Sequence, residues 1–128
     1  AEDASFGFPE VSVGLSVTGG ISRLLPALVG WARAKELLLL GERVSGAEAA
    51  AMGLVARCVP AGEHEAVALD LARRMAERPA LSLSLAKQVL DAGLDSTVDE
   101  AMAREVEHAL LTSLSGEGEA PREGFNRG

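Results

Sequence analysis

Apolar residues recur at every third or fourth position through most of the chain after residue 30, a period that predicts amphipathic helices. The pattern predicts helices over residues 31–40, 63–78, 80–92 and 97–114. Two apolar stripes run along the helix over 80–92, so we expect that helix to be buried on two sides. One face of the last helix carries an apolar residue at every fourth position: Val98, Met102, Val106, Leu110 and Leu114.

Helix start and stop signals support these boundaries. Ser45 and Glu48 form a capping box, because the serine hydroxyl can accept a backbone N–H while the glutamate reaches back to the serine N–H. This box begins a short alanine-rich helix before Gly53. Thr97 opens the last helix with the same signal. Gly41 is placed to cap the C-terminal end of the helix over 31–40.

The first thirty residues are rich in glycine and proline, which predicts loops and turns. Short runs at 5–6 and 11–13 favour strands, residues 20–28 favour one or two helical turns, and residues 54–59 form one further strand candidate. These pieces cannot close a sheet by themselves, because their backbone N–H and C=O groups need partners. We therefore expect the chain to be the C-terminal part of a larger fold.

Composition and charge narrow the classes of function. Hydrophobic residues make up 48% and charged residues 24%, a balance typical of a globular domain. A net charge of −7 argues against a general nucleic-acid surface, which needs a basic footprint. No run approaches the roughly 20 apolar residues that span a membrane. Cys58 is a single cysteine beside two distant histidines, so we expect no disulfide, no bound metal and a reducing, cytoplasmic location.

A dense motif lies near the start of the chain. Residues 6–15 read Phe-Gly-Phe-Pro-Glu-Val-Ser-Val-Gly-Leu, and further glycine-containing motifs follow at 19–22, 25–30, 36–41 and 45–55. In order and spacing these segments resemble the C-terminal half of the crotonase superfamily, the enoyl-CoA hydratases and isomerases. The likeness covers essentially the whole chain.

The resemblance implies an α/β fold of the crotonase-like ββα-spiral type. Residues 1–60 would form the end of the catalytic core, and residues 61–128 a helical region that assembles a homotrimer or homohexamer. In the family, the segment upstream of Ala1 supplies the oxyanion-hole N–H groups and often a second glutamate. We therefore expect the 128-residue chain to be inactive by itself.

Glu10 is the candidate catalytic residue. Adding water across the double bond of an enoyl-CoA thioester, or shifting that bond, requires proton transfer at carbon, and a fixed carboxyl group can act as the general acid/base. The enolate formed would be held by N–H donors of the oxyanion hole. Pro9 and Gly14 constrain the loop that carries Glu10. Outside this motif, the same glutamate would be interpreted as a solvated loop residue or a salt-bridge partner.

The resemblance also implies an acyl-CoA substrate in fatty acid metabolism, with coenzyme A as part of the substrate and no other cofactor. The residues expected to border the substrate are Phe6, Pro9, Gly14, Val17, Thr18, Gly19, Leu110 and Leu114. Thr18 stands where hydratases commonly have a glycine, and its side chain narrows the space near the reacting water. Leu24 replaces a common arginine. Hydratase, isomerase, thioester hydrolase and carbon–carbon lyase reactions all stay open, as does a non-catalytic helical assembly module.

Other residues with reactive side chains are expected to be structural. We expect His64 and His108 to lie on the surface, Ser45 to act only as a helix cap, and Cys58 to be a buried small hydrophobic residue in a strand. The basic C-terminal residues that usually meet the coenzyme phosphates in this family are represented only by Arg122 and Arg127.

Overall fold

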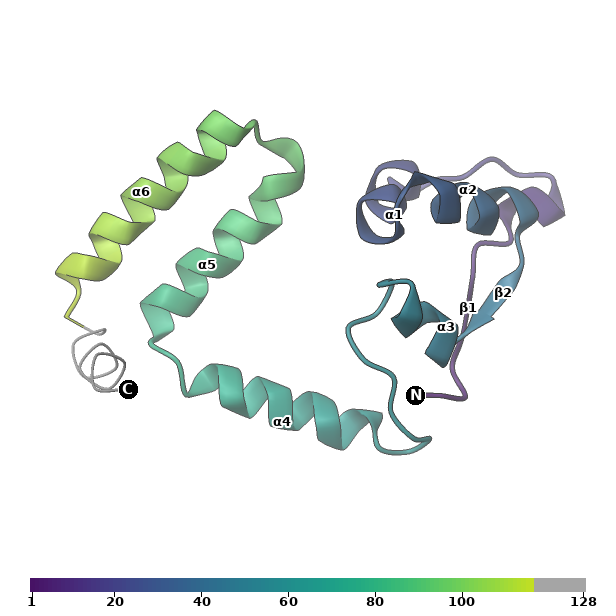
Figure 1. Ribbon diagram of the computed structural model, residues 1–128, viewed down its shortest axis with the longest axis horizontal. Coiled ribbons are helices and arrows are strands. Elements are labelled where there is room, and N and C mark those ends of the chain that lie inside the picture. Colours follow the sequence, from purple (N-terminus) through teal and green to yellow (C-terminus); the bar gives the residue numbers. More distant parts are fainter. Residues whose placement is uncertain (117–128) are drawn as a thin grey trace. The chain divides into compact units, whose positions relative to one another are not determined.

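The computed structural model describes residues 1–116, which divide into a first unit over Ala1–Ala68 and a second that begins at Leu69 (Figure 1). The first unit contains two short strands, a 3-10 turn and three helices. In chain order these are β1 (Ser5–Gly7), η1 (Glu10–Val13), α1 (Ile21–Val29), α2 (Trp31–Leu40), β2 (Arg43–Ser45) and α3 (Gly46–Ala51). The helix α4 (His64–Ala76) starts in the first unit and ends in the second. The predicted division into the end of the catalytic core, residues 1–60, and a helical region, residues 61–128, concerns the complete fold and stays a prediction.

Strands β1 and β2 pair in antiparallel fashion, with Phe6 opposite Val44. The Arg43 side chain reinforces the pair, since its Nε donates to the Ser5 Oγ at 2.8 Å and its Nη2 donates to the Ser5 carbonyl at 3.3 Å. The sequence predicted the first strand but not β2. Three residues carry too little periodic signal, and β2 owes its extended form to a partner 38 residues away.

Two predicted strands are wrong. Residues 11–13 belong to the 3-10 turn η1, where the Ser12 N–H donates to the Pro9 carbonyl at 2.9 Å and satisfies the backbone locally. Residues 54–59 contain no strand, because the N–H groups of Leu54 and Val55 both return to the Ala49 carbonyl, at 2.9 and 3.3 Å. The chain therefore folds back onto the end of α3 instead of extending.

The core of the first unit lies between α1 and α2. Leu25 is completely buried and packs with Ala34, Leu37 and Leu38. The half-buried apolar residues around this cluster come from the loops, from the two ends of α1, from β2 and from the segment after α3: Phe8, Val17, Ile21, Val29, Val44, Met52 and Leu54. The loop that precedes α1 is thereby fastened to the same core as the helices.

The predicted helix boundaries agree with the structure. The Ser45 Oγ accepts the Glu48 N–H at 3.2 Å, and the Glu48 carboxylate accepts the Ser45 N–H at 2.8 Å. Thr97 and Glu100 form the same capping box before the last helix. Gly41 ends α2 in the left-handed conformation, with a φ of 67°.

The second unit consists mainly of α5 (Ala80–Ala92), the 3-10 turn η2 (Gly93–Asp95) and α6 (Val98–Leu114). Helices α5 and α6 pack against each other, and Leu85 is the buried residue at their contact. The expected burial of α5 on two sides is not found within the described residues, since Leu90 on the second stripe is 77% exposed. None of the helices within residues 1–116 is long and apolar enough to cross a membrane.

Candidate active site

Glu10 is the first residue of η1, directly after Pro9. Its carbonyl accepts the Leu15 N–H at 2.8 Å, and Gly14 reverses the chain with a φ of 77°. Pro9 has a fixed φ before the turn, and Gly14 supplies the left-handed conformation that closes it. Glu10 therefore lies at the start of a tight turn bounded by Pro9 and Gly14.

One oxygen of the Glu10 carboxylate differs from those of a structural carboxylate. Its Oε2 is buried, and no hydrogen-bond donor reaches it from the described part of the chain. Burying a carboxyl oxygen without a hydrogen-bond partner is costly, so native structures retain such groups mainly where function requires them or where another group completes the site. The two simpler interpretations, a solvated loop residue and a salt-bridge partner, do not describe this oxygen.

Six of the eight predicted substrate-binding residues lie on the same continuous segment as Glu10. Phe6 and Val17 are half-buried, and Val17 packs on the core. Thr18 is exposed, and its carbonyl accepts the Ile21 N–H at 3.4 Å. The remaining three residues of this segment are exposed: Pro9, Gly14 and Gly19.

Leu110 and Leu114 belong to the second unit and lie on α6, with exposed fractions of 62% and 85%. They continue the apolar stripe of α6, whose five predicted residues are all at least 58% exposed. Their predicted contact with an acyl-CoA stays a prediction. Arg122 and Arg127 lie outside the described residues.

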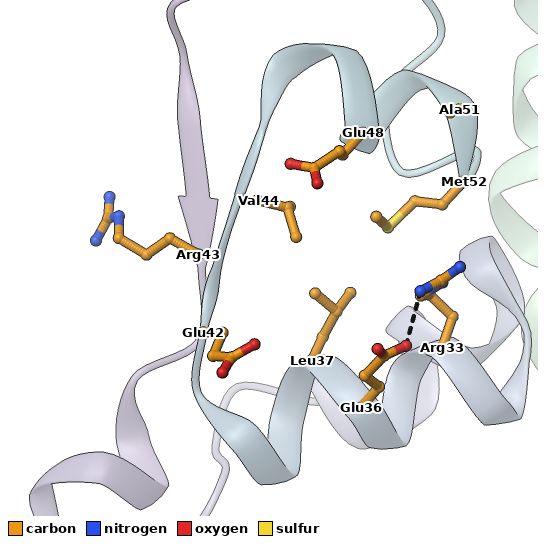
Figure 2. Close-up of a pocket in the computed structure, with 9 residues that line it drawn as sticks. All are labelled: Arg33, Glu36, Leu37, Glu42, Arg43, Val44, Glu48, Ala51 and Met52. Carbon is orange, nitrogen blue, oxygen red and sulfur yellow. Dashed lines mark hydrogen bonds and ion pairs between the residues drawn. The ribbon is translucent and has the colours of Figure 1, made fainter.

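A cavity of about 340 Å³ in the first unit contains neither Glu10 nor any predicted site residue. Figure 2 shows its charged lining, with Glu36 paired to Arg33, Glu42 and Glu48 at other edges of the cavity, and the Arg43 side chain pointing away. These groups have structural partners: the Arg33 Nη1 and the Glu36 Oε2 are 2.7 Å apart, and the Ser45 backbone N–H and then its hydroxyl lower the pKa of Glu48. We do not place the reaction in this cavity.

The second unit contains an apolar groove of about 480 Å³ between α5 and α6, which sequence analysis missed. Leu85, Val89 and Leu90 line it together with His108, whose Nδ1 is buried without a partner in the described residues. The prediction of a surface His108 is therefore wrong, because packing against α5 covers part of the ring. His64 is exposed as predicted.

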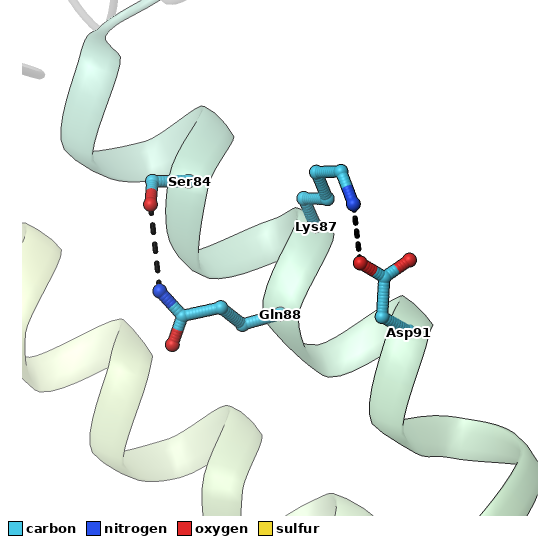
Figure 3. Close-up of polar contacts among 4 residues, drawn as sticks. All are labelled: Ser84, Lys87, Gln88 and Asp91. Atoms are coloured by element: carbon cyan, nitrogen blue, oxygen red, sulfur yellow. Dashed lines mark hydrogen bonds and ion pairs between the residues drawn. The ribbon is translucent and has the colours of Figure 1, made fainter.

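The outward-facing part of α5 carries polar side chains that pair along the helix (Figure 3). The Gln88 Nε2 donates to the Ser84 Oγ at 3.4 Å, and Lys87 forms an ion pair with Asp91. Both members of the ion pair are largely exposed, so the pair contributes little to stability.

The other candidates are structural. Ser45 caps α3, as predicted. Cys58 is half-buried, not fully buried, and lies in irregular chain because the predicted strand does not form. Within residues 1–116, no group of three or more histidine, cysteine, aspartate or glutamate side chains could hold a metal ion.

Comparison with known proteins matches residues 1–126 to the enoyl-CoA hydratase/isomerase family. The chain is 36% identical over 113 residues to the Arabidopsis thaliana protein named "Probable enoyl-CoA hydratase 2, mitochondrial", covering 88% of this chain and 37% of that protein. It is 33% identical over 114 residues to the 2,3-dehydroadipyl-CoA hydratase of Escherichia coli, covering 89% and 44%.

A solved enoyl-CoA hydratase subunit of Geobacillus kaustophilus superposes with a TM-score of 0.89 at 33% identity. The match covers 99% of this chain and 49% of that one. An enoyl-CoA hydratase of Bacillus anthracis superposes equally well, with a TM-score of 0.89 at 28% identity. The chain thus has the crotonase fold and spans about half of these structures, and less than half of the curated relatives.

Proposed function

The chain belongs to the enoyl-CoA hydratase/isomerase family, and from that premise we propose that it is the C-terminal half of an enzyme that hydrates or isomerises enoyl-CoA thioesters, with Glu10 as general acid/base. The observation that carries the proposal is the buried, unpartnered Oε2 of Glu10 on a loop held by Pro9 and Gly14.

The chemistry requires a group of this kind. Hydration adds a hydroxyl to one carbon of the double bond and a proton to the other, while isomerisation removes a proton from one carbon and returns it to another. In both reactions, negative charge develops on the thioester oxygen as an enolate. A carboxyl group that exchanges a proton with carbon, together with N–H donors at that oxygen, lowers the barrier. In this proposal the N–H donors come from the part of the fold outside this chain.

The proposed substrate is an acyl-CoA that binds along residues 6–19. Coenzyme A takes part only as a portion of this substrate. Phe6 and Val17 offer apolar surface suited to an acyl chain, because both side chains are half-buried and Val17 packs on the core. The Thr18 side chain is exposed beside them and would restrict that space. Cytoplasmic location stays a prediction, and several relatives are mitochondrial by name.

We also propose that the complete protein assembles as a homotrimer or homohexamer through its helical region. The exposed stripe of α6 supports this, because contiguous apolar surface of this kind marks an interface in proteins that stay in solution.

The proposal is tested by assaying hydration of crotonyl-CoA and double-bond shift of a 3-enoyl-CoA with the full-length protein and with the 128-residue chain. We expect one of the two reactions from the full-length protein and neither from the chain alone, because this proposal places the oxyanion donors outside it. Turnover by the chain alone would contradict this division of the site. If the full-length protein catalyses neither reaction but still assembles, the result favours the alternative function, a non-catalytic helical assembly module.

A further inference from the structure

The C-terminal end of α2 lies directly against the turn that carries Glu10. A Cβ added to Gly41 would overlap the Ser12 Oγ, and it would lie 3.4 Å from the Val11 Cγ2 and 3.6 Å from the Phe8 carbonyl oxygen. Helix α2 and η1 therefore meet at a position that has no room for a side chain.

This contact holds η1 from the side away from Glu10. Residues three apart share one side of a 3-10 helix, so Glu10 and Val13 lie together, and Val13 is 67% exposed. Val11 and Ser12 occupy the other sides and meet Gly41. The end of α2 thus contacts the turn at Val11 and Ser12, the two residues that follow Glu10.

A second close approach fixes the chain just before Glu10. A Cβ on Gly7 would lie 3.1 Å from the Arg43 Cγ and 3.4 Å from the Glu42 carbonyl oxygen. Residues 41–43 therefore contact the chain on both sides of Glu10, at Gly7 and at Ser12. A displacement of residues 41–43 would therefore also displace the η1 turn.

We propose that Gly41 is a positioning residue for Glu10, an inference that rests on the proposed function. It has two properties that no other residue type combines: it adopts the left-handed conformation that ends α2, and it lets η1 seat directly on the helix end. Its role in the reaction is to set where the Glu10 carboxyl group stands relative to the substrate.

The test is Gly41→Ala in the full-length protein, with kcat and KM measured per folded enzyme. Displacing a catalytic group by about 1 Å can cost on the order of 100-fold in rate, so we expect kcat to fall by about 10- to 100-fold while KM changes little. Gly62→Ala is the matched control. Gly62 also has a positive φ, of 84°, but nothing in the described residues lies within 4 Å of a Cβ there, so it should keep its kcat.

A second pair of variants separates positioning from folding. Ser12→Ala removes the overlapping oxygen and should restore part of the kcat of Gly41→Ala. Ser12→Val crowds the same contact without straining Gly41 and should lower kcat even if Gly41→Ala does not fold. Equal kcat values for Gly41→Ala and Gly62→Ala, or a Ser12→Val enzyme with normal kcat, would overturn the inference.

Glu10→Gln is measured in parallel. Loss of turnover in Glu10→Gln together with a normal Gly41→Ala enzyme refutes only the positioning role. Normal turnover in Glu10→Gln refutes the proposed function.

Discussion

Three glutamates at the start of helical segments show how local partners decide the role of a carboxylate. Glu48 and Glu100 each accept a backbone N–H and a hydroxyl hydrogen bond in a capping box. Glu10 opens η1, but its Oε2 accepts nothing from the described residues. The first two carboxylates are used for local structure, and the third has its bonding capacity available for chemistry.

The capping boxes make a pH-dependent prediction. The backbone N–H of Ser45, followed by its hydroxyl, holds the pKa of Glu48 below the ordinary 4.5, and Thr97 does the same for Glu100. A lowered folded-state pKa stabilises the fold fully above the unfolded value, and this contribution is lost as the pH falls through the folded-state pKa. Carboxyl titration by NMR should therefore give values below 4.5 for both groups.

Ser45→Ala should move the Glu48 pKa part of the way back towards its ordinary value, because the backbone hydrogen bond stays. Thr97→Ala leaves α3 unchanged and serves as the control for Glu48. A Glu48 value at or above 4.5 in the unmodified chain would contradict the capping geometry.

At the scale of elements, α6 has two faces with different surroundings. His108 and Thr112 lie toward α5 in the groove, whereas the predicted apolar stripe stays exposed. A helix that packs on one side and leaves five large apolar residues exposed on another presents surface suited to a second partner. Subunit assembly is the role that we propose for that stripe.

Lysine substitutions test this attribution. The double variant Val106→Lys and Leu110→Lys places two charges in the stripe, and burying unpaired charge is costly, so the full-length protein should dissociate into smaller species in light scattering after size exclusion. Gln88→Lys adds a charge on the polar side of α5 and should leave the mass unchanged. An unchanged mass in the double variant would show that assembly uses another surface.

The helices were predictable from the sequence because their signals are local. Apolar periods and the pairs Ser45–Glu48 and Thr97–Glu100 lie within a few residues, and the structure places these helices and caps as predicted. Strand β2 and the burial of His108 were not predictable, because each depends on a partner distant in the chain or across a helix pair. The false strand at 54–59 arose because an apolar run does not reveal that its N–H groups return to Ala49.

The same distinction applies to the candidate site. Glu10 could be found from its motif, since Pro9 and Gly14 flank it in sequence. The contact of Gly41 with Ser12 could not, because a glycine at the end of a helix is explained equally well by capping alone.

At the scale of the whole molecule, the chain accounts for about half of the structures it superposes on, and the proposed site requires donors from elsewhere in the protein. Each unit has its own packing. Glu10 lies in the first unit, where α2 and the paired strands contact the loop that carries it. The central claim is therefore that this half supplies the acid/base of a reaction completed by the other half.

The most direct test of that claim is the turnover of Glu10→Gln in the full-length protein, with Glu63→Gln as an exposed carboxylate control. General acid/base groups contribute typically about 100- to 10,000-fold, so turnover in Glu10→Gln should fall by at least about 100-fold while the acyl-CoA still binds, and Glu63→Gln should behave normally. Near-normal turnover in Glu10→Gln would contradict the account.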